Sequence, residues 1–243
     1  NNKYDPSNLK PAVDRLSSST DRQEEHVILD FTMGKDVGIG ILGSGEYSLT
    51  AGLRFAEFKS YTKGDMRGIP DMSVPDAWGQ NDTTFHQYID TFEAHRKFAG
   101  AGPTISWNAN EPLLNVEDAG QVTVDWTVTG GVLFGHRKAT VKATEGSSYF
   151  DAHYPGYPAG YVLNGLPAPA QTPINVAPRD KSAAVPLLDL SLGLSYRVKG
   201  VELSGGYRWE RYFGAIDGGF QQSRSEDRSL YGPYLRASIG FGG

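Results

Sequence analysis

The stretch GQVTVDWTVTGGVLFG, residues 120–135, decides which fold this sequence can adopt. Apart from Gly130, an apolar side chain stands at every second position from Val122 to Phe134. Polar or small residues, such as Thr123 and Asp125, stand between them as far as Gly131. A period of two is the pattern of a β-strand with one apolar and one polar face. The open question is whether the apolar face packs on a protein core or on lipid.

The same alternation recurs along the chain. The stretch extends over 120–137, and six further segments alternate in the same way: 27–41, 46–56, 96–108, 186–198, 201–213 and 231–241. A tilted transmembrane strand needs about 9–11 residues, and all of these segments are long enough. The sequence therefore predicts an all-β, antiparallel, up-and-down transmembrane β-barrel in which seven strands are visible. Since single-chain bacterial barrels normally have an even number of strands, we expect at least eight. We expect the further strand to be an upstream one that is missing from this sequence, or to come from an atypical pairing of residues 1–20.

The connections between the segments are of two kinds. Residues 43–46 and 198–200 form tight turns, whereas 61–84, 145–184 and 215–229 are long and are predicted to be loops. Structureless loops of that length are uncommon in compact soluble domains. Short periplasmic turns and long extracellular loops are typical of outer-membrane barrels. We therefore expect an N-terminal loop or extension over 1–26 and a transmembrane barrel over 27–243.

The polar face carries acids and arginines but no lysine. A planar guanidinium binds a carboxylate through two hydrogen bonds and is more weakly hydrated than an ammonium group, so arginine suits an enclosed site. We interpret this face as the barrel lumen and the apolar face as the lipid surface. The predicted lumen charge network comprises Asp30, Asp36, Arg54, Arg96, Asp125, Arg137, Asp189, Arg197, Glu202, Arg208, Glu210 and Arg236.

Aromatic residues stand near the ends of the alternating segments. Aromatic side chains, Trp and Tyr above all, concentrate at membrane–water interfaces, because a Trp or Tyr ring is apolar and carries one polar group. The predicted interfacial residues are Tyr47, Trp107, Tyr196 and Phe241 at the short-turn rim, and Phe213 and Tyr231 at the long-loop rim.

Composition excludes several functions. The 243 residues carry a net charge of −5 and show no basic stripe, so no nucleic-acid partner is predicted. The chain has no cysteine, and its five histidines lack metal-ligand spacing, so we expect neither a metal site nor a cofactor. GIGILG, residues 38–43, matches G-x-G-x-x-G but is followed by a strand pattern. A dinucleotide site requires a helix there, so these glycines are expected to line the lumen and form the turn.

Three alternatives remain open at this point. A soluble lipocalin-like ligand-binding barrel would use the apolar face as its core. An outer-membrane lipid-modifying enzyme would need a catalytic base such as His136, with Ser147 or Ser148 as its nucleophile. The lumen charges themselves would either plug a narrow barrel or line a wider channel, because eight-stranded barrels are filled by side chains and 16-stranded ones are not.

Several stretches resemble the Legionella-type major outer membrane protein family, over about residues 27–241. They are LTAGLRFAEF (49–58), RKFAGAGPTISWNA (96–109), GGVLFGHRKA (130–139), VPLLDLSLGLSY (185–196) and LSGGYRWERYF (203–213). The resemblance implies a β-barrel in the bacterial outer membrane, with the lipid bilayer as its partner and without catalytic residues. The expected function is that of a pore or of a structural and surface-interaction protein. The loops 61–84 and 145–184 are the candidate surfaces for a protein partner or an oligomer.

Overall fold

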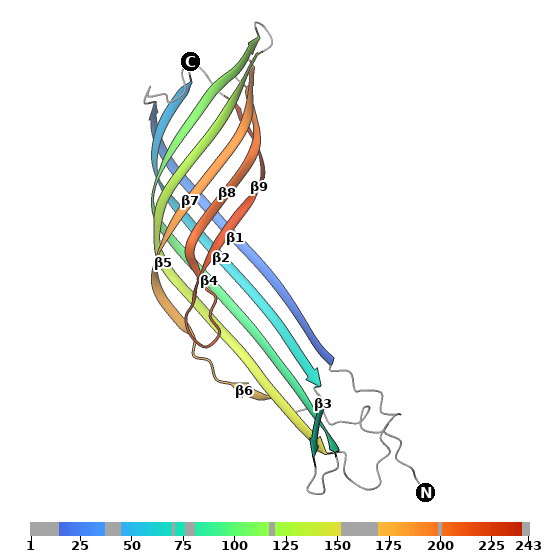
Figure 1. The fold of residues 1–243 in the computed structure, drawn as a ribbon. Coiled ribbons are helices and arrows are strands. Elements are labelled where there is room, and N and C mark those ends of the chain that lie inside the picture. The colour runs from blue at the N-terminus through green and yellow to red at the C-terminus, as the bar shows by residue number, and fades with distance from the viewer. Residues whose placement is uncertain are drawn as a thin grey trace, which may run out of the picture. The chain divides into compact units, whose positions relative to one another are not determined.

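A computed structural model describes residues 15–36, 45–69, 71–75, 81–116, 120–151, 170–198 and 201–239. Most residues of these ranges are in strands, and none of the described residues belongs to a helix that could cross a membrane. The strands are β1 (Arg15–Asp36), β2 (Glu46–Ile69), β3 (Asp71–Pro75), β4 (Asn81–Val116), β5 (Gly120–Asp151), β6 (Thr172–Ile174), β7 (Arg179–Val198), β8 (Val201–Asp217) and β9 (Ser225–Ile239) (Figure 1).

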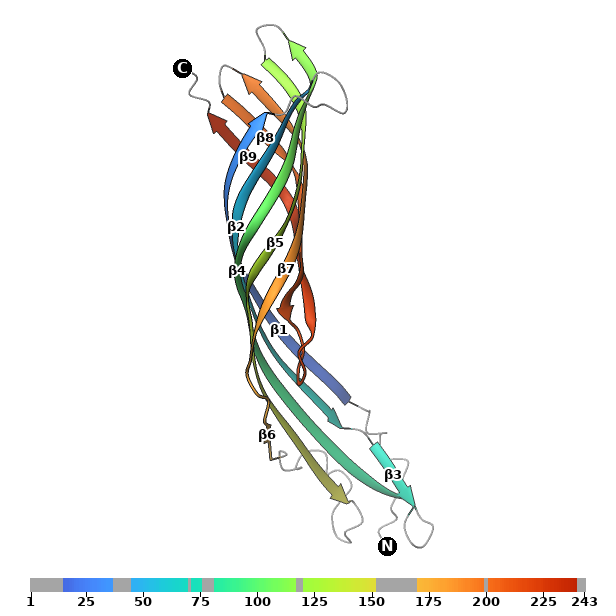
Figure 2. The same cartoon turned by 90° about the vertical axis from the view of Figure 1, so that its left-hand side faces the viewer.

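The strands form one sheet in the order β1-β2-β4-β5-β7-β8-β9, which can be followed in Figure 2. The short strands β3 and β6 pair with β4 and β5, respectively. Each main strand therefore lies beside the next main strand along the chain, and the pairs that β7 makes with β5 and β8 are antiparallel. The prediction of an all-β, up-and-down antiparallel fold is confirmed.

The strand register places residues of one kind on one face. Val124 lies opposite Leu194, and Asp189 lies opposite Glu210. Directly opposed residues project to the same side of a sheet, so polar positions share one face and apolar positions share the other. The pairing of β8 with β9 is interrupted between Tyr212 and Ile216, where the register shifts.

The sheet divides into two compact units. Unit 2 comprises Glu24–Lys59, Arg96–Ala139 and Arg179–Gly243, and unit 1 comprises Asn1–Gln23, Ser60–His95 and Thr140–Pro178. The seven alternating segments of the sequence fall almost entirely in unit 2. We call the face of unit 2 that carries Arg54 and Asp189 the inner face, and the opposite one the outer face.

The outer face of unit 2 exposes large apolar side chains, and its inner face carries buried charged ones. On β7, Leu192 and Leu194 of the outer face are 61% and 55% exposed, whereas Asp189 of the inner face is 4% exposed. The same contrast holds on β2, where Leu53 and Phe55 are exposed and Arg54 is buried. In water this arrangement would be unfavourable, because large apolar side chains are normally buried and charged ones are not. A lipid environment around the outer face removes the conflict.

The height of the apolar outer band fits a membrane. On β5 the outer positions run from Val122 to Phe134, and on β7 they run from Ala184 to Tyr196. At about 3.3 Å per residue, twelve steps span about 40 Å, and a strand tilt of about 35–45° reduces this to roughly 28–33 Å. The hydrocarbon core of a bilayer is about 30 Å thick. His136 follows Phe134 and Glu57 follows Phe55 on the outer face, so charge begins where the band ends.

The strands are longer than predicted, which corrects the predicted loops. β1 begins at Arg15, so residues 15–26 are strand and not loop. Strands β2, β3 and β4 occupy most of the predicted loop 61–84. Strands β5, β6 and β7 occupy parts of the predicted loop 145–184. The predicted loop 215–229 is shorter than expected, because β8 extends to Asp217 and β9 begins at Ser225. Beyond the apolar band the outer positions become polar, as at Lys59, Tyr61 and Lys63, so the apolar period disappears although strand pairing continues. Residues 1–14 and 152–169 lie outside the described ranges, and the further upstream strand stays a prediction.

Candidate functional site in the barrel lumen

Arg54 of β2 is the centre of an ionic network on the inner face. Its guanidinium donates to both carboxylate oxygens of Asp30 on β1, at 2.5 and 2.8 Å. It also donates to Asp189 of β7 at 3.0 Å and to the Tyr212 hydroxyl of β8 at 3.2 Å. In the strand order, β4 and β5 separate β2 from β7. The inner faces of these distant strands therefore meet at Arg54, which requires the sheet of unit 2 to curl.

Arg208 of β8 completes the network. It donates to the two oxygens of Asp189 at 2.9 and 2.6 Å and forms an ion pair with Glu210. Asp189 and Glu210 are both buried, and Arg54 lies 3.7 Å from Glu210. Buried carboxylates are costly unless they are paired and hydrogen-bonded, and two arginines provide that pairing here.

An apolar cluster fills the inner face next to this network. Its largest members are fully buried and come from five strands: Phe58, Phe98, Leu133, Val185, Tyr212 and Ile216. The Phe58 ring lies 4.7 Å from the Tyr212 ring and 6.2 Å from the Phe98 ring, measured between centroids. Ile28 of β1 and Leu230 of β9 pack against the cluster from the two ends of the strand order. Sequence reasoning missed this cluster, although Ala56 and Phe58 continue the parity of Arg54 and would have indicated it.

The connection between β8 and β9 is held by arginines of other strands. Arg179 of β7 donates to Asp217 at 2.8 Å and to the carbonyl oxygens of Gly219 and Phe220 at 2.7 and 2.9 Å. Arg96 of β4 donates to the Gly218 carbonyl at 3.3 Å. The connection is thereby fixed against β4 and β7, across the inner face.

Asp217 organises this connection from within. Its carboxylate accepts hydrogen bonds from the backbone N–H groups of Gly219 and Arg224, at 3.1 and 3.0 Å. Burial alone would raise the pKa of Asp217, but hydrogen bonds from Arg179, Arg224, Ser223 and Gly219 lower it to about 2. Asp217 lies beyond the apolar band, and it stays ionised at any physiological pH.

A polar cavity of about 240 Å³ opens on the inner face near the short turns. Its lining includes the acids Glu46, Asp125 and Glu202 together with Arg236. Asp125 accepts hydrogen bonds from Thr123 and Ser195. At the rim, Arg197 donates to Glu202 at 2.9 and 2.6 Å. We call this cavity the vestibule.

The remaining predicted lumen residues are distributed as follows. Arg137 of β5 faces the adjoining ends of β8 and β9, where it donates to the Gly214 carbonyl at 3.0 Å and to Ser225 at 2.6 Å. Gly214 has a φ of +66°, a conformation that favours glycine. Arg236 lies in the vestibule, 6.0 Å from the Tyr234 ring. The Asp36 side chain lies outside the described residues. The eleven predicted charges whose side chains are described thus form three separate groups, whereas the sequence predicted one network.

The predicted interfacial aromatics divide in two. Tyr196, Phe213 and Tyr231 are exposed on the outer face, and Tyr231 is 71% exposed. The prediction is wrong for Tyr47, which is 2% exposed, donates a hydrogen bond to Glu111 and lines the vestibule. Trp107 is half-buried between the Tyr47 and Trp126 rings, at centroid distances of 6.4 and 4.6 Å. Phe241 lies outside the described residues.

His136, the candidate base of a lipid-modifying enzyme, is exposed on the outer face. Its Nδ1 lies 3.4 Å from Asp180, to which Lys138 also forms an ion pair at 3.0 Å. The hydrogen bond from Lys138 is the main cause that lowers the pKa of Asp180. Within the ranges that the structure describes, no serine hydroxyl is hydrogen-bonded to His136. His136, Lys138 and Asp180 therefore form a polar group just outside the apolar band.

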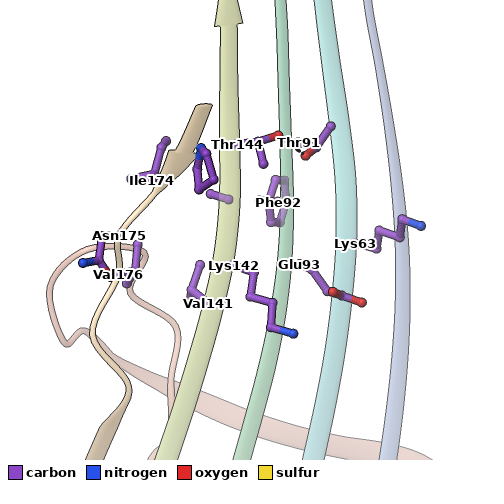
Figure 3. Close-up of a pocket in the computed structure, with 12 residues that line it drawn as sticks. Lys63, Thr91, Phe92, Glu93, Val141, Lys142, Thr144, Ile174, Asn175 and Val176 are labelled. Carbon is purple, nitrogen blue, oxygen red and sulfur yellow. Dashed lines mark hydrogen bonds between the residues drawn. The ribbon is translucent and has the colours of Figure 1, made fainter. Parts of the chain in front are cut away.

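Unit 1 has a pocket of its own, of about 480 Å³ (Figure 3). Lys142 and Glu93 extend from neighbouring strands toward one side, and Ile174 and Val176 lie on the other side of β5. Tyr61 donates to Glu93 at 2.7 Å, and this hydrogen bond is the main cause that lowers the pKa of Glu93. Among the described residues, no group of three or more His, Cys, Asp or Glu side chains could hold a metal ion.

An up-and-down antiparallel sheet with an apolar outer band and a charged inner face defines an outer-membrane β-barrel protein. The comparison with known families agrees. The chain matches the family model of the Legionella pneumophila major outer membrane protein precursor over residues 9–241. The chain belongs to this family, and its place is the bacterial outer membrane. No curated protein and no solved structure matches it.

Proposed function

We propose that this protein is a non-enzymatic outer-membrane barrel with a lumen closed to solutes, serving as a structural and surface-interaction protein. The observation that carries the proposal is the contact of Arg54 on β2 with Asp189 and Tyr212 on β7 and β8. Side chains that meet across the inner face support a lumen that is closed at that level. Narrow barrels are generally filled in this way.

Two further layers support a closed lumen. The apolar cluster around Phe98 and Tyr212 lies next to the ionic network, and both side chains are fully buried. The β8–β9 connection is fixed over the inner face by Arg96 and Arg179. An ion would have to displace each layer, and an apolar constriction alone excludes hydrated ions.

The test is conductance in a planar bilayer, with the wild type, Arg54→Ala and the double variant Arg54→Ala/Phe98→Ala measured side by side. We expect the wild type to insert without current steps and the double variant to conduct. Phe134→Ala, which truncates an exposed outer-face side chain, is the matched control and should stay silent. Defined steps in the wild type whose ion preference changes in Arg54→Ala would refute closure.

A pore is the second candidate, and the vestibule favours it. This cavity is polar, carries three carboxylates and lies on the inner face. In a pore it would form the part of the channel next to the short turns. Current steps in the wild type would select this function.

The surface-interaction role concerns the segments outside the apolar band. The strands of unit 1 carry polar, exposed side chains such as Lys63 and Lys142. Together with the segments 61–84 and 145–184, they are the proposed contact region for a partner or a second copy. Capture of a second, differently tagged copy in detergent would support self-association; deleting residues 152–169 should abolish it.

A further inference from the structure

We infer that the inner face holds a binding site for a small oxyanion, such as phosphate, between Arg137 and Lys181. The inference is independent of whether the barrel conducts. The two residues are directly opposed partners of β5 and β7. Directly opposed side chains on one face have Cβ atoms about 4.5–5.5 Å apart, and like charges in that arrangement destabilise a sheet. A repulsive pair of this kind is explained if an anion lies between its members.

The neighbourhood does not neutralise this pair. The described partners of Arg137 are the Gly214 carbonyl and the Ser225 hydroxyl, which are both uncharged. For Lys181, the structure records no hydrogen bond or ion pair within its described ranges. Arg179 stands two residues from Lys181 on the same face, and its charge is matched by Asp217. The result is a local excess of positive charge in a chain whose net charge is −5.

Arg137 also has unused hydrogen-bonding capacity. Its Nη1 atom serves Gly214 and Ser225, whereas its Nε atom is buried and has no acceptor among the described residues. A buried donor without an acceptor is costly. The Nε and Nη2 atoms together form the edge of a guanidinium that binds an oxyanion through two parallel hydrogen bonds. The exposed Lys181 would supply the second cation from the facing strand.

Two inner-face neighbours of this pair are small side chains. Ala139 and Ala183 flank Arg137 and Lys181 on the same inner face. Neither carries a polar group or a long chain. The geometry therefore favours a compact tetrahedral oxyanion, either free or at the end of a larger solute.

The test is calorimetric titration of the full chain in neutral detergent with inorganic phosphate at low ionic strength. Lys181→Gln is the decisive variant, because Lys181 makes no recorded contact that the fold would lose. We expect the wild type to bind phosphate and Lys181→Gln and Arg137→Gln to bind about tenfold or more weakly. Lys138→Gln removes one positive charge from the outer face of β5, the strand of Arg137. This variant should bind phosphate as the wild type does.

Two results of this titration would overturn the inference. One is the absence of phosphate binding to the wild type at millimolar concentration. The other is equal affinity in Lys181→Gln and Lys138→Gln, which would place bound phosphate elsewhere. A third arm replaces free phosphate by vesicles containing phosphatidic acid. Binding to these vesicles that excludes free phosphate would assign the anion to a lipid headgroup at the outer face and would contradict an inner-face site.

Discussion

Replacing Arg54 by alanine tests whether the charges of the inner face hold the barrel together. Arg54 is 3% exposed and bonds to Asp30, Asp189 and Tyr212 at once. Its removal leaves Asp189 and Glu210 buried with Arg208 as their remaining cation. Removing one partner of a buried ion pair typically costs about 3–5 kcal/mol, because the other partner stays buried and uncompensated.

Arg197→Ala is the matched control. Arg197 also pairs with a carboxylate, Glu202, but its side chain is 43% exposed at the rim. Exposed pairs of this kind contribute about 0–1 kcal/mol. We therefore expect the free energy of unfolding to fall by about 3–5 kcal/mol in Arg54→Ala and by no more than about 1 kcal/mol in Arg197→Ala.

The assay is urea unfolding of each variant folded into lipid vesicles, followed by tryptophan fluorescence. Arg54→Lys keeps the charge but loses the two-pronged geometry, so its stability should lie between those of the wild type and Arg54→Ala. Equal midpoints and slopes for Arg54→Ala and Arg197→Ala would show that the inner network does not stabilise the fold and would refute the reasoning.

Three further predictions concern the outer face, the β8–β9 connection and the vestibule. Leu192→Arg places a charge in the apolar outer band and should lower the free energy of unfolding in vesicles by about 2–4 kcal/mol. Ser191→Arg places its charge on the inner face, away from lipid, and should not show this loss. Because the pKa of Asp217 is about 2, below its ordinary 3.8, its ion pair stabilises the connection above pH 3.8 and is lost as the pH falls toward 2. A dye on Gln222→Cys should therefore report no change between pH 8 and pH 5; a transition near pH 6 would contradict this. Tyr47→Phe removes the hydrogen bond to Glu111 and should lower the unfolding free energy by about 1 kcal/mol; an unchanged value would show that the bond adds nothing.

The faces of the barrel could be predicted from the sequence because lipid and lumen impose opposite chemistry on alternate residues. Leu192 and Asp189 illustrate this, since parity alone places the first outside and the second inside. The ends of the strands could not be predicted in the same way. Past Phe55 the outer positions are Glu57 and Lys59, so the apolar period of the outer face stops there although the strand continues.

The contents of the lumen were predictable only in part. Arginine without lysine at the polar positions of the alternating segments indicated enclosed ion pairs, and Arg54 with Asp189 forms such a pair, whereas the pair of Arg197 with Glu202 is exposed at the rim. Which arginine meets which acid depends on how far the sheet curls, and strand parity contains no information on curvature. The contacts of Arg96 with the Gly218 carbonyl and of Arg137 with the Gly214 carbonyl could not be predicted for a related reason. A backbone carbonyl is the same in every residue, so no residue type marks it as a partner.

The edge strand β1 has one further consequence for the barrel. In unit 2 its described side chains are exposed on both faces, except for the half-buried Ile28. On the inner face this strand is attached by the ion pair of Asp30 with Arg54, by the packing of Ile28 against the apolar cluster and by the contact of Glu24 with Arg228 at 3.1 Å. A strand attached at so few points separates more easily than one packed along its length. If β1 separated first, the barrel would open sideways toward the bilayer. The Asp30–Arg54 ion pair would oppose this separation.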